Sequence, residues 1–377
     1  MPSLFNYSFT ADELRRLTGT LDQLAGIRLV EYADGKVRGL RAAEVWTGSG
    51  FRFTIWLDLG MDIGPAEFAG KPLAWLHPGL GTPGQFEPEK YGWLRTFGGG
   101  LVTTCGLTHF GQPEQDGVEA LGLHGRISHI PAQSVRVTTE WQGDAYVLAV
   151  EGEVRQAVLF GENLLLKRRI STQLGATSLL IEDCVRNDGF RATPHMLLYH
   201  CNFGFPVVSP DSELIVDDES VRPRDVVAER GLGFLTRFEA PDPKYAEQVF
   251  FHYPRPDASG NVIASILNRV LNLRAFIRYR AAELPALAQW KMMGARDYVC
   301  ALEPATNHET PRALLREEGA LKLLKPGEPV NYLLELVSCL RSSLTNSGDV
   351  QQPVSRDPLC FPRSRSVVAE RSYSTNF

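Results

Sequence analysis

YVLAVEGEVRQAVL, residues 146–159, is the stretch that decides the fold class of this chain. Apolar and polar residues alternate along it, so an extended backbone buries one face and leaves the other in water. Similar β-rich runs occur on both sides of it. They are IRLVEY (27–32), VRGLRAAEVW (37–46), FRFTIWLDL (51–59), VRVTTEW (135–141), LLLKRRISTQL (164–174) and SLLIEDCVRN (178–187).

Turn-forming residues separate these runs, as hairpin connections require. Examples are residues 33–35, 47–50 and 187–189. No strand-helix-strand rhythm is present, which argues against a parallel sheet. The sequence therefore predicts an all-β fold, a large antiparallel β-sandwich, whose last core strand includes Leu333–Leu336.

One short helix is expected near the N-terminus, over Thr10 to about Leu24. Thr10 and Glu13 have the spacing of a capping box, and Leu14, Leu17 and Leu21 are spaced for one helical face.

The domain organisation is predicted to be simple. Neither an internal repeat nor a linker rich in Pro, Gly and Ser divides residues 1–340, which favours a single domain. Residues 341–377 are polar, with too few apolar side chains to offset the entropy of ordering, so a mobile tail is expected there.

The composition argues against several classes of partner. With 39 basic and 44 acidic residues, the formal charge is −5, which attracts neither nucleic acid nor anionic membranes. The six cysteines form no CxxC pair, and we find no export signal or membrane span. A cytoplasmic location is expected, and the oligomeric state is not specified.

Three glycines at 98–100 follow Arg95 and form the first candidate for a binding segment. In one interpretation the glycines let the backbone approach a ligand, which Arg95 also contacts. In the other, the glycines form a sharp bend between strands and Arg95 lies in solvent. A phosphate loop is excluded because the GK[ST] ending is missing.

His124 and Arg126, within LHGR, form the second candidate. In an extended segment they would share one sheet face, where an imidazole and a guanidinium suit vicinal sugar hydroxyl groups. The alternative is a surface histidine beside a surface arginine.

His200 and Asn202, within HMLLYHCNFGFP (195–206), form the third candidate. Alternation places them on one face of an otherwise apolar strand, where each needs a hydrogen-bond partner. A core histidine with a structural partner is the alternative.

Glu303 is the fourth candidate, at the end of a hydrophobic strand and just before Pro304. Strand ends commonly border pockets, and burial would raise the pKa of this carboxyl group toward the range of a general base. The alternative is a glutamate that caps a turn.

Taken in order, these stretches resemble motifs of the galactose mutarotase superfamily, in particular a bacterial branch called DUF4432. The resemblance spans about residues 25–340. Leu123–Gly125 resembles the LHG motif that supplies a substrate-binding histidine, and residues 199–202 resemble the NHxYFN motif of the acid histidine. Residues 300–304, CALEP, resemble the strand that supplies the base glutamate.

The resemblance implies a galactose mutarotase-like sandwich and an aldose 1-epimerase that interconverts sugar anomers without a cofactor or metal. Glu303 would be the base and His200 the acid. The upstream Asn-Arg pair and the sugar-binding Asp of the family have no plain match. Polar contacts with the substrate are expected from His124, Arg126, Asn202, Arg95 and Asp62. Trp290 or Trp141 would offer an apolar face to the sugar ring. Lys291 would bind an acidic substituent of the sugar, or it is an ordinary surface lysine.

Two other functions stay open. The first is a carbohydrate-binding protein without catalysis. The second is a metal-dependent sugar isomerase or lyase that uses His124, His200, Glu303 and either His252 or His308 as ligands.

Overall fold

The computed structural model describes residues 1–340, and the predicted tail at 341–377 lies outside the described residues. Strands predominate, and every strand pair within the sheets is antiparallel. The prediction of an all-β antiparallel sandwich is confirmed.

The largest sheet has eight strands in the order β11-β12-β13-β14-β25-β21-β20-β17. Its β12 is the alternating stretch that predicted the fold, and the predicted last core strand lies in β25. The strands are β11 Gln133–Gln142, β12 Ala145–Ala157, β13 Asn163–Gln173, β14 Ser178–Asn187, β17 Ser212–Val216, β20 Asn261–Asn268, β21 Leu273–Arg280 and β25 Pro329–Leu340.

Two smaller sheets complete the sandwich. One has the order β3-β4-β5-β6-β7 and the other the order β18-β19-β22-β23-β16-β8. The first comprises β3 Gly26–Glu31, β4 Arg41–Trp46, β5 Phe51–Trp56, β6 Asp62–Phe68 and β7 Lys71–Pro72. The second comprises β8 Thr103–Leu107, β16 Met196–Gly204, β18 Asp218–Pro223, β19 Gln248–Pro254, β22 Ala286–Met293 and β23 Tyr298–Ala305.

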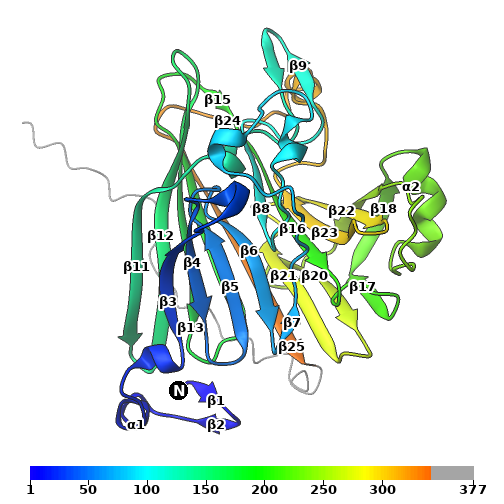
Figure 1. Cartoon of the computed structure of the whole chain (residues 1–377). Helices are drawn as coiled ribbons and strands as arrows, with labels where there is room; N and C mark the ends of the chain where they lie inside the picture. The colour runs from blue at the N-terminus through cyan, green and yellow to red at the C-terminus, as the bar shows by residue number, and fades with distance from the viewer. Residues whose placement is uncertain (341–377) are drawn as a thin grey trace, which may run out of the picture.

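The core lies between the eight-stranded sheet and the two smaller sheets, which adjoin each other through bridges from Ile63 to Val102 and from Ala74 to Phe203. One cluster of buried side chains includes Ile55 of β5, Val150 of β12 and Leu302 of β23. Figure 1 shows the strands β3–β5 in front of the long strands of the large sheet. A shared core of this kind supports one domain over residues 1–340, which stays a prediction.

The N-terminal helix α1 spans Ala11–Leu17 and begins with the predicted capping box between Thr10 and Glu13. It is shorter than expected because Thr18 returns to an extended conformation, and Leu17 is 67% exposed rather than packed beside Leu14.

Other short elements were not predicted and lie in connections between strands. The α-helices are α2 Val226–Gly231 and α3 Arg312–Glu317, and the 3-10 helices are η1 Leu21–Gln23, η2 Gly35–Val37, η3 Pro83–Gln85, η4 Gly92–Arg95, η5 Ile127–His129 and η6 Leu232–Phe234. Short strand pairs are β1 Ser3–Leu4 with β2 Tyr7–Ser8, β9 Glu114–Asp116 with β10 Glu119–Leu121, and β15 Thr193–Pro194 with β24 Leu323–Leu324.

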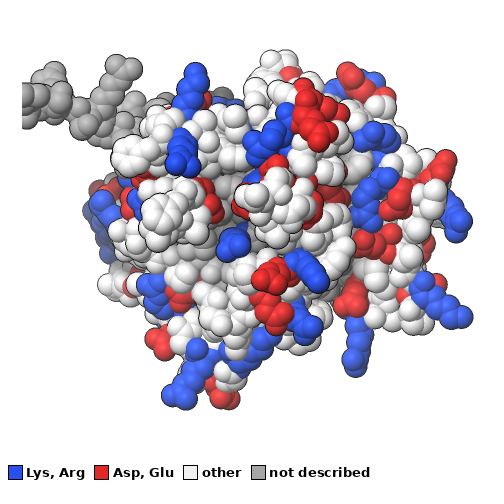
Figure 2. Space-filling model, turned by 90° about the horizontal axis from the view of Figure 1, so that it is seen from above, with Lys and Arg blue, Asp and Glu red and all other residues white. Residues whose placement is uncertain are grey.

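Within residues 1–340, no helix has the length and apolar character needed to cross a membrane. Figure 2 shows that Lys and Arg are interspersed with Asp and Glu over the upper face of the molecule.

Candidate active site

His200 and Glu303 meet across two neighbouring strands. The register pairs Cys201 of β16 with Leu302 of β23, and Leu198 with Ala305, so His200 lies opposite Glu303. The Nε2 atom of His200 is 3.2 Å from Oε1 of Glu303. The strand β23 continues through Pro304 to Ala305, so Glu303 lies inside the strand and not at its end as expected.

The sheet face that carries this pair is lined by small side chains. Ala288 pairs with Glu303, and Ala286 pairs with Ala305, so their methyl groups lie on the same face. Trp290, two residues beyond Ala288, lies on this face as well. Small residues beside two large polar ones leave space above the sheet.

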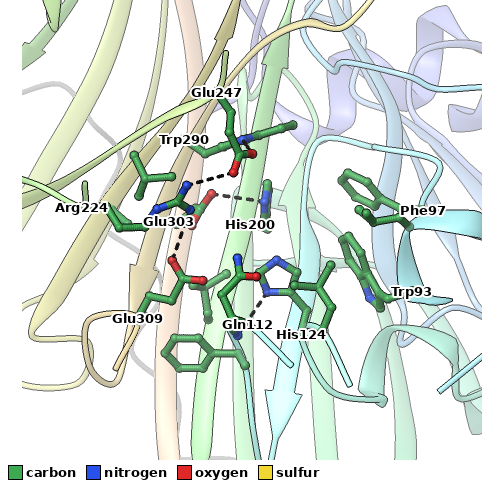
Figure 3. Close-up of a pocket in the computed structure, with 18 of the residues that line it drawn as sticks. Trp93, Phe97, Gln112, His124, His200, Arg224, Glu247, Trp290, Glu303 and Glu309 are labelled. Atoms are coloured by element: carbon green, nitrogen blue, oxygen red, sulfur yellow. Dashed lines mark hydrogen bonds and ion pairs between the residues drawn. The ribbon is translucent and has the colours of Figure 1, made fainter. Parts of the chain in front are cut away.

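That space is a cavity of about 580 Å³, which falls in the size range of small-molecule sites. His200, Glu303, His124 and Trp290 all line it, and Figure 3 shows their side chains directed toward a common centre. The structure therefore brings together three of the predicted site residues and one of the two proposed tryptophans.

One wall of the cavity is aromatic. Trp93 stacks on Phe97 with 4.3 Å between ring centroids, and Phe97 meets the edge of His200 at 5.7 Å. Trp290 contacts His200 from another side at 5.4 Å, and Trp75 also lines this wall. Flat apolar rings of this kind pack well against the carbon faces of a sugar ring.

The opposite wall carries charged groups that the sequence did not indicate. Nη2 of Arg224 lies 2.9 Å from Oε1 of Glu247, and Nη1 lies 3.7 Å from Oε2 of Glu309 (Figure 3). The Nε1 atom of Trp290 donates to Oε2 of Glu247 at 3.0 Å. Arg224 thus joins two carboxyl groups, and one of them holds Trp290 in place.

Burial controls the protonation of the central pair. It raises the pKa of Glu303 well above its usual range, and the neighbouring Glu309 raises it further. Burial also lowers the pKa of His200 to about 4, although the hydrogen bond to Asn202 opposes this shift. Both groups therefore favour their neutral forms, in which the imidazole has one N–H group and the carboxyl group is protonated.

Asn202 shares the face of His200, as predicted, but its role differs from the predicted substrate contact. It is fully buried and does not line the cavity. Its Oδ1 lies 2.5 Å from Nδ1 of His200, and its Nδ2 donates to the carbonyl oxygens of Gly100 and His200 at 3.0 Å. All its hydrogen bonds are within the protein.

His124 reaches the cavity from a turn rather than from a strand. It has a φ of 57°, and Gly125 follows at 75°, where a Cβ atom would lie 2.4 Å from the carbonyl oxygen of Gly106. The backbone of Gly111 donates to Nδ1 of His124 at 3.4 Å. Burial lowers the pKa of His124 well below its usual value, so the imidazole is neutral and Nε2 is the donor.

Arg126 does not share the face of His124, so that prediction is wrong. The alternation of a strand does not hold through a turn with two positive φ angles. Arg126 is exposed and borders a different hollow, beside Arg191 and Phe160.

Of the two roles considered for Arg95 and the glycines at 98–100, the structure shows the bend between strands with Arg95 in solvent. The side chain of Arg95 is 72% exposed and pairs with Glu87 at 3.2 Å. Gly99 and Gly100 have φ angles of 69° and 100° and form a corner, at which a Cβ on Gly99 would lie 2.4 Å from Trp75 O. Arg95 does not line the cavity of His200 and Glu303.

Asp62, another predicted substrate contact, does not line the cavity either. It is buried beneath the sheet, where Oδ1 pairs with Nη1 of Arg168 at 2.9 Å and Thr104 donates to both of its oxygens. Burial raises its pKa to about 6 against the effect of Arg168. Asp183 pairs with the same guanidinium, so Arg168 is the shared ion-pair partner of two core carboxyl groups.

Lys291 follows Trp290 directly and therefore points to the other side of the sheet. It is fully buried, with Nζ donating to the carbonyl oxygen of Phe234 at 2.9 Å and paired with Glu239. It is neither a contact for an acidic substituent nor a surface lysine. Trp141 lies on β11 against Tyr146, far from the cavity lining.

The metal hypothesis receives no support from the side-chain arrangement. Among residues 1–340, no group of three or more His, Cys, Asp or Glu side chains is placed to hold a metal ion. His252 bonds to Asp218 and Gln289 instead, and His308 borders the cavity next to Tyr253 and Phe251.

Three cavity residues missed in the sequence come from connections between strands. Arg224 directly follows β18, Glu247 immediately precedes β19, and Glu309 lies in the loop after β23. Only Glu309 had a local signal, because it follows the strand of Glu303 by a few residues together with Asn307 and His308.

Comparison with protein families places this geometry in context. Residues 37–337 match the profile described as "Domain of unknown function (DUF4432)". The chain belongs to the DUF4432 family. No functionally curated protein matches this member of the family.

Solved structures show that this DUF4432 protein has a galactose mutarotase-like fold. A Klebsiella pneumoniae protein provisionally assigned as an aldose 1-epimerase has a TM-score of 0.79 at 21% identity, over 89% of this chain and 94% of that one. A galactose mutarotase-like protein from Clostridium acetobutylicum has a TM-score of 0.57 at 14% identity, over 84% and 99%. Galactose 1-epimerase from Lactobacillus acidophilus has a TM-score of 0.55 at 14% identity, over 84% of this chain and 99% of that one.

Proposed function

We propose that this DUF4432 protein is an isomerase of the aldose 1-epimerase type, which binds a free sugar in the cavity and interconverts its anomers. The observation that carries the proposal is the 3.2 Å contact between Nε2 of His200 and Oε1 of Glu303 inside a cavity of about 580 Å³. An aldose 1-epimerase-like fold supports it at the level of architecture.

The reaction requires an acid and a base at the same carbon atom. Ring opening removes the proton of the anomeric hydroxyl group and adds a proton to the ring oxygen, and both oxygens are bonded to C1. Adjacent groups such as Glu303 and His200 suit this geometry, with the carboxylate as base and the imidazolium as acid. Rotation about the C1–C2 bond and the reverse transfers then close the ring on the other face of the aldehyde.

The remaining walls of the cavity suit an uncharged sugar. Trp290, Trp93 and Phe97 offer apolar surface to the ring, while Nε2 of His124 donates a hydrogen bond. Gln112 and Glu309 border the same space and are able to bind hydroxyl groups. Each positioned proton transfer contributes about a hundredfold to ten-thousandfold in rate, so the reaction needs no cofactor.

The test measures exchange between anomers by NMR magnetisation transfer over a panel of hexoses, pentoses, deoxysugars and uronates. We expect at least one aldose to exchange faster than in buffer, and Glu303→Gln to lower that excess rate at least about a hundredfold. The matched control is Glu335→Gln, because Glu335 is a partly buried carboxyl group of β25 paired with Arg278, outside the cavity.

Two outcomes would contradict the proposal. Undiminished exchange in a folded Glu303→Gln protein would remove Glu303 from the mechanism. Saturable sugar binding without exchange above the buffer rate, for every aldose tested, would instead indicate a carbohydrate-binding protein on the same scaffold.

A further inference from the structure

The orientation of the Asn202 side-chain amide is determined by its surroundings. Its Nδ2 lies 3.0 Å from the carbonyl oxygens of Gly100 and His200, and both of these atoms only accept hydrogen bonds. Exchanging the amide oxygen and nitrogen would place the oxygen against two carbonyl oxygens. Oδ1 must therefore face His200.

This orientation in turn determines the tautomer of His200. Because Oδ1 only accepts, the Nδ1 atom at 2.5 Å must carry a proton. A neutral imidazole has one proton, so its Nε2 atom then has a lone pair. This is the nitrogen that lies 3.2 Å from Oε1 of Glu303, and Oε1 has no other hydrogen-bond partner among the described residues.

We propose that Asn202 is a positioning residue, which fixes His200 as the Nδ1–H tautomer, so that in the free enzyme the single proton shared with Glu303 resides on the carboxyl group. The part of this inference that concerns rate rests on the proposed function; the part that concerns the proton does not. Asn202 acts only through His200, because it does not line the cavity.

The surroundings of His200 and Glu303 also favour a proton on the carboxyl group. Burial lowers the pKa of His200 to about 4 and raises that of Glu303 well above its usual range. The titratable or charged groups that interact with the pair are Glu247, Glu309, Arg224, His124 and the buried thiols of Cys105, Cys201 and Cys300. Arg224 opposes the raised pKa of Glu303, but its guanidinium is already paired with Glu247 and Glu309.

The single proton gives a closed catalytic cycle. It first passes from Glu303 to Nε2 of His200 along their existing contact, which generates a carboxylate and an imidazolium. Ring opening then transfers the anomeric hydroxyl proton to Glu303 and the Nε2 proton to the ring oxygen. Opening the ring therefore restores the proton distribution of the free enzyme, and no exchange with solvent is needed.

The direct test is the tautomer of His200 in the wild-type protein without sugar. The protein contains eight histidines, so the His200 signals in a ¹⁵N-histidine NMR spectrum are assigned by their loss in His200→Gln. We expect a protonated Nδ1 and an unprotonated Nε2 throughout the neutral range. A proton on Nε2 alone, or on both nitrogens, would overturn the proposal.

A variant tests the role of Asn202 itself. Asn202→Leu removes the acceptor, and we expect mixed tautomers and a kcat at least about tenfold lower, with little change in KM. Asn187→Leu is the matched control, since Asn187 is equally buried and also donates to two carbonyl oxygens and accepts from a backbone amide. Its His200 signals and kcat should match those of the wild type.

The outcomes separate the two proposals. If Asn202→Leu does not fold, the Asn202→Ser variant and the wild-type spectrum still test which tautomer His200 adopts. Unchanged His200 signals and an unchanged kcat in a folded Asn202→Leu protein would show that Asn202 only supports the fold. The expected tautomer without epimerisation of any aldose would contradict the proposed function and leave the proton assignment intact.

Discussion

The imidazole of His200 and the carboxyl group of Glu303 lie opposite each other on the adjacent strands β16 and β23, 3.2 Å apart and almost completely buried. A neutral imidazole and a neutral carboxyl group are both favoured by this burial, so one proton is available to move between the carboxyl group and Nε2 of His200. The activity of the pair should therefore depend on the pH at which His200 gains a proton and on the pH at which Glu303 loses one.

The pH profile should reflect this shared proton. Below pH about 4 the imidazole of His200 is protonated while Glu303 keeps its proton, so no base is left and kcat/KM should fall. The alkaline limb should begin only above the raised pKa of Glu303. The profile is measured by polarimetry with subtraction of spontaneous mutarotation, and an acid limb centred near about 6.5, the usual pKa of histidine, would contradict this prediction.

Trp290 is predicted to contribute to sugar binding. Replacing it with leucine removes the ring that contacts His200 at 5.4 Å, and KM should rise about twofold to tenfold, as expected for one aromatic contact. Trp141→Leu is the control, because Trp141 packs on Tyr146 outside the cavity. Equal effects of both changes on KM would indicate that the aromatic wall does not contact the sugar.

The cavity should discriminate against acidic sugars. Its only Lys or Arg side chain among the described residues is Arg224, which already pairs with carboxyl groups of Glu247 and Glu309. A uronate would therefore bring an unpaired charge into a site rich in carboxyl groups. Galacturonate should bind at least about tenfold more weakly than galactose, whereas its methyl ester, which is neutral, should recover most of this loss by calorimetry.

Arg168 is predicted to be essential for stability rather than for catalysis. Arg168→Met would leave Asp62 and Asp183 as buried carboxyl groups without a cation, at a cost of about 3–5 kcal/mol in the free energy of unfolding. Arg169→Met is the control, since the ion pairs of Arg169 are more exposed and should contribute about 0–1 kcal/mol. Urea unfolding measures the free energy of unfolding of both variants. Equal losses of stability in the two would contradict the prediction.

Several features of the site could be predicted from local sequence. His200 and Asn202 share a strand face because side chains alternate along β16. Glu303 was recognised from its position beside Pro304 in an apolar strand. The same rule of alternation explains why Lys291, next to Trp290, points away from the cavity, whereas the sequence had left open a substrate contact or a surface lysine.

The wrong predictions share a physical cause. The prediction that His124 and Arg126 share a strand face fails because a turn with positive φ angles separates their side chains. The carboxylate of Asp62 pairs with Arg168, which follows much later in the chain. In each case a contact with a distant segment, or a local departure from extended backbone, decided where the side chain points.

Local patterns in the sequence were enough to predict many of the long strands and the start of the first helix, because alternation and a capping box depend on residues close in the chain. Only the tertiary structure decided that His200 faces Glu303 and that Arg224, Glu247 and Glu309 enclose the same cavity. Strand order and register follow from packing the whole sheet against the core, and that packing is not encoded in any one segment.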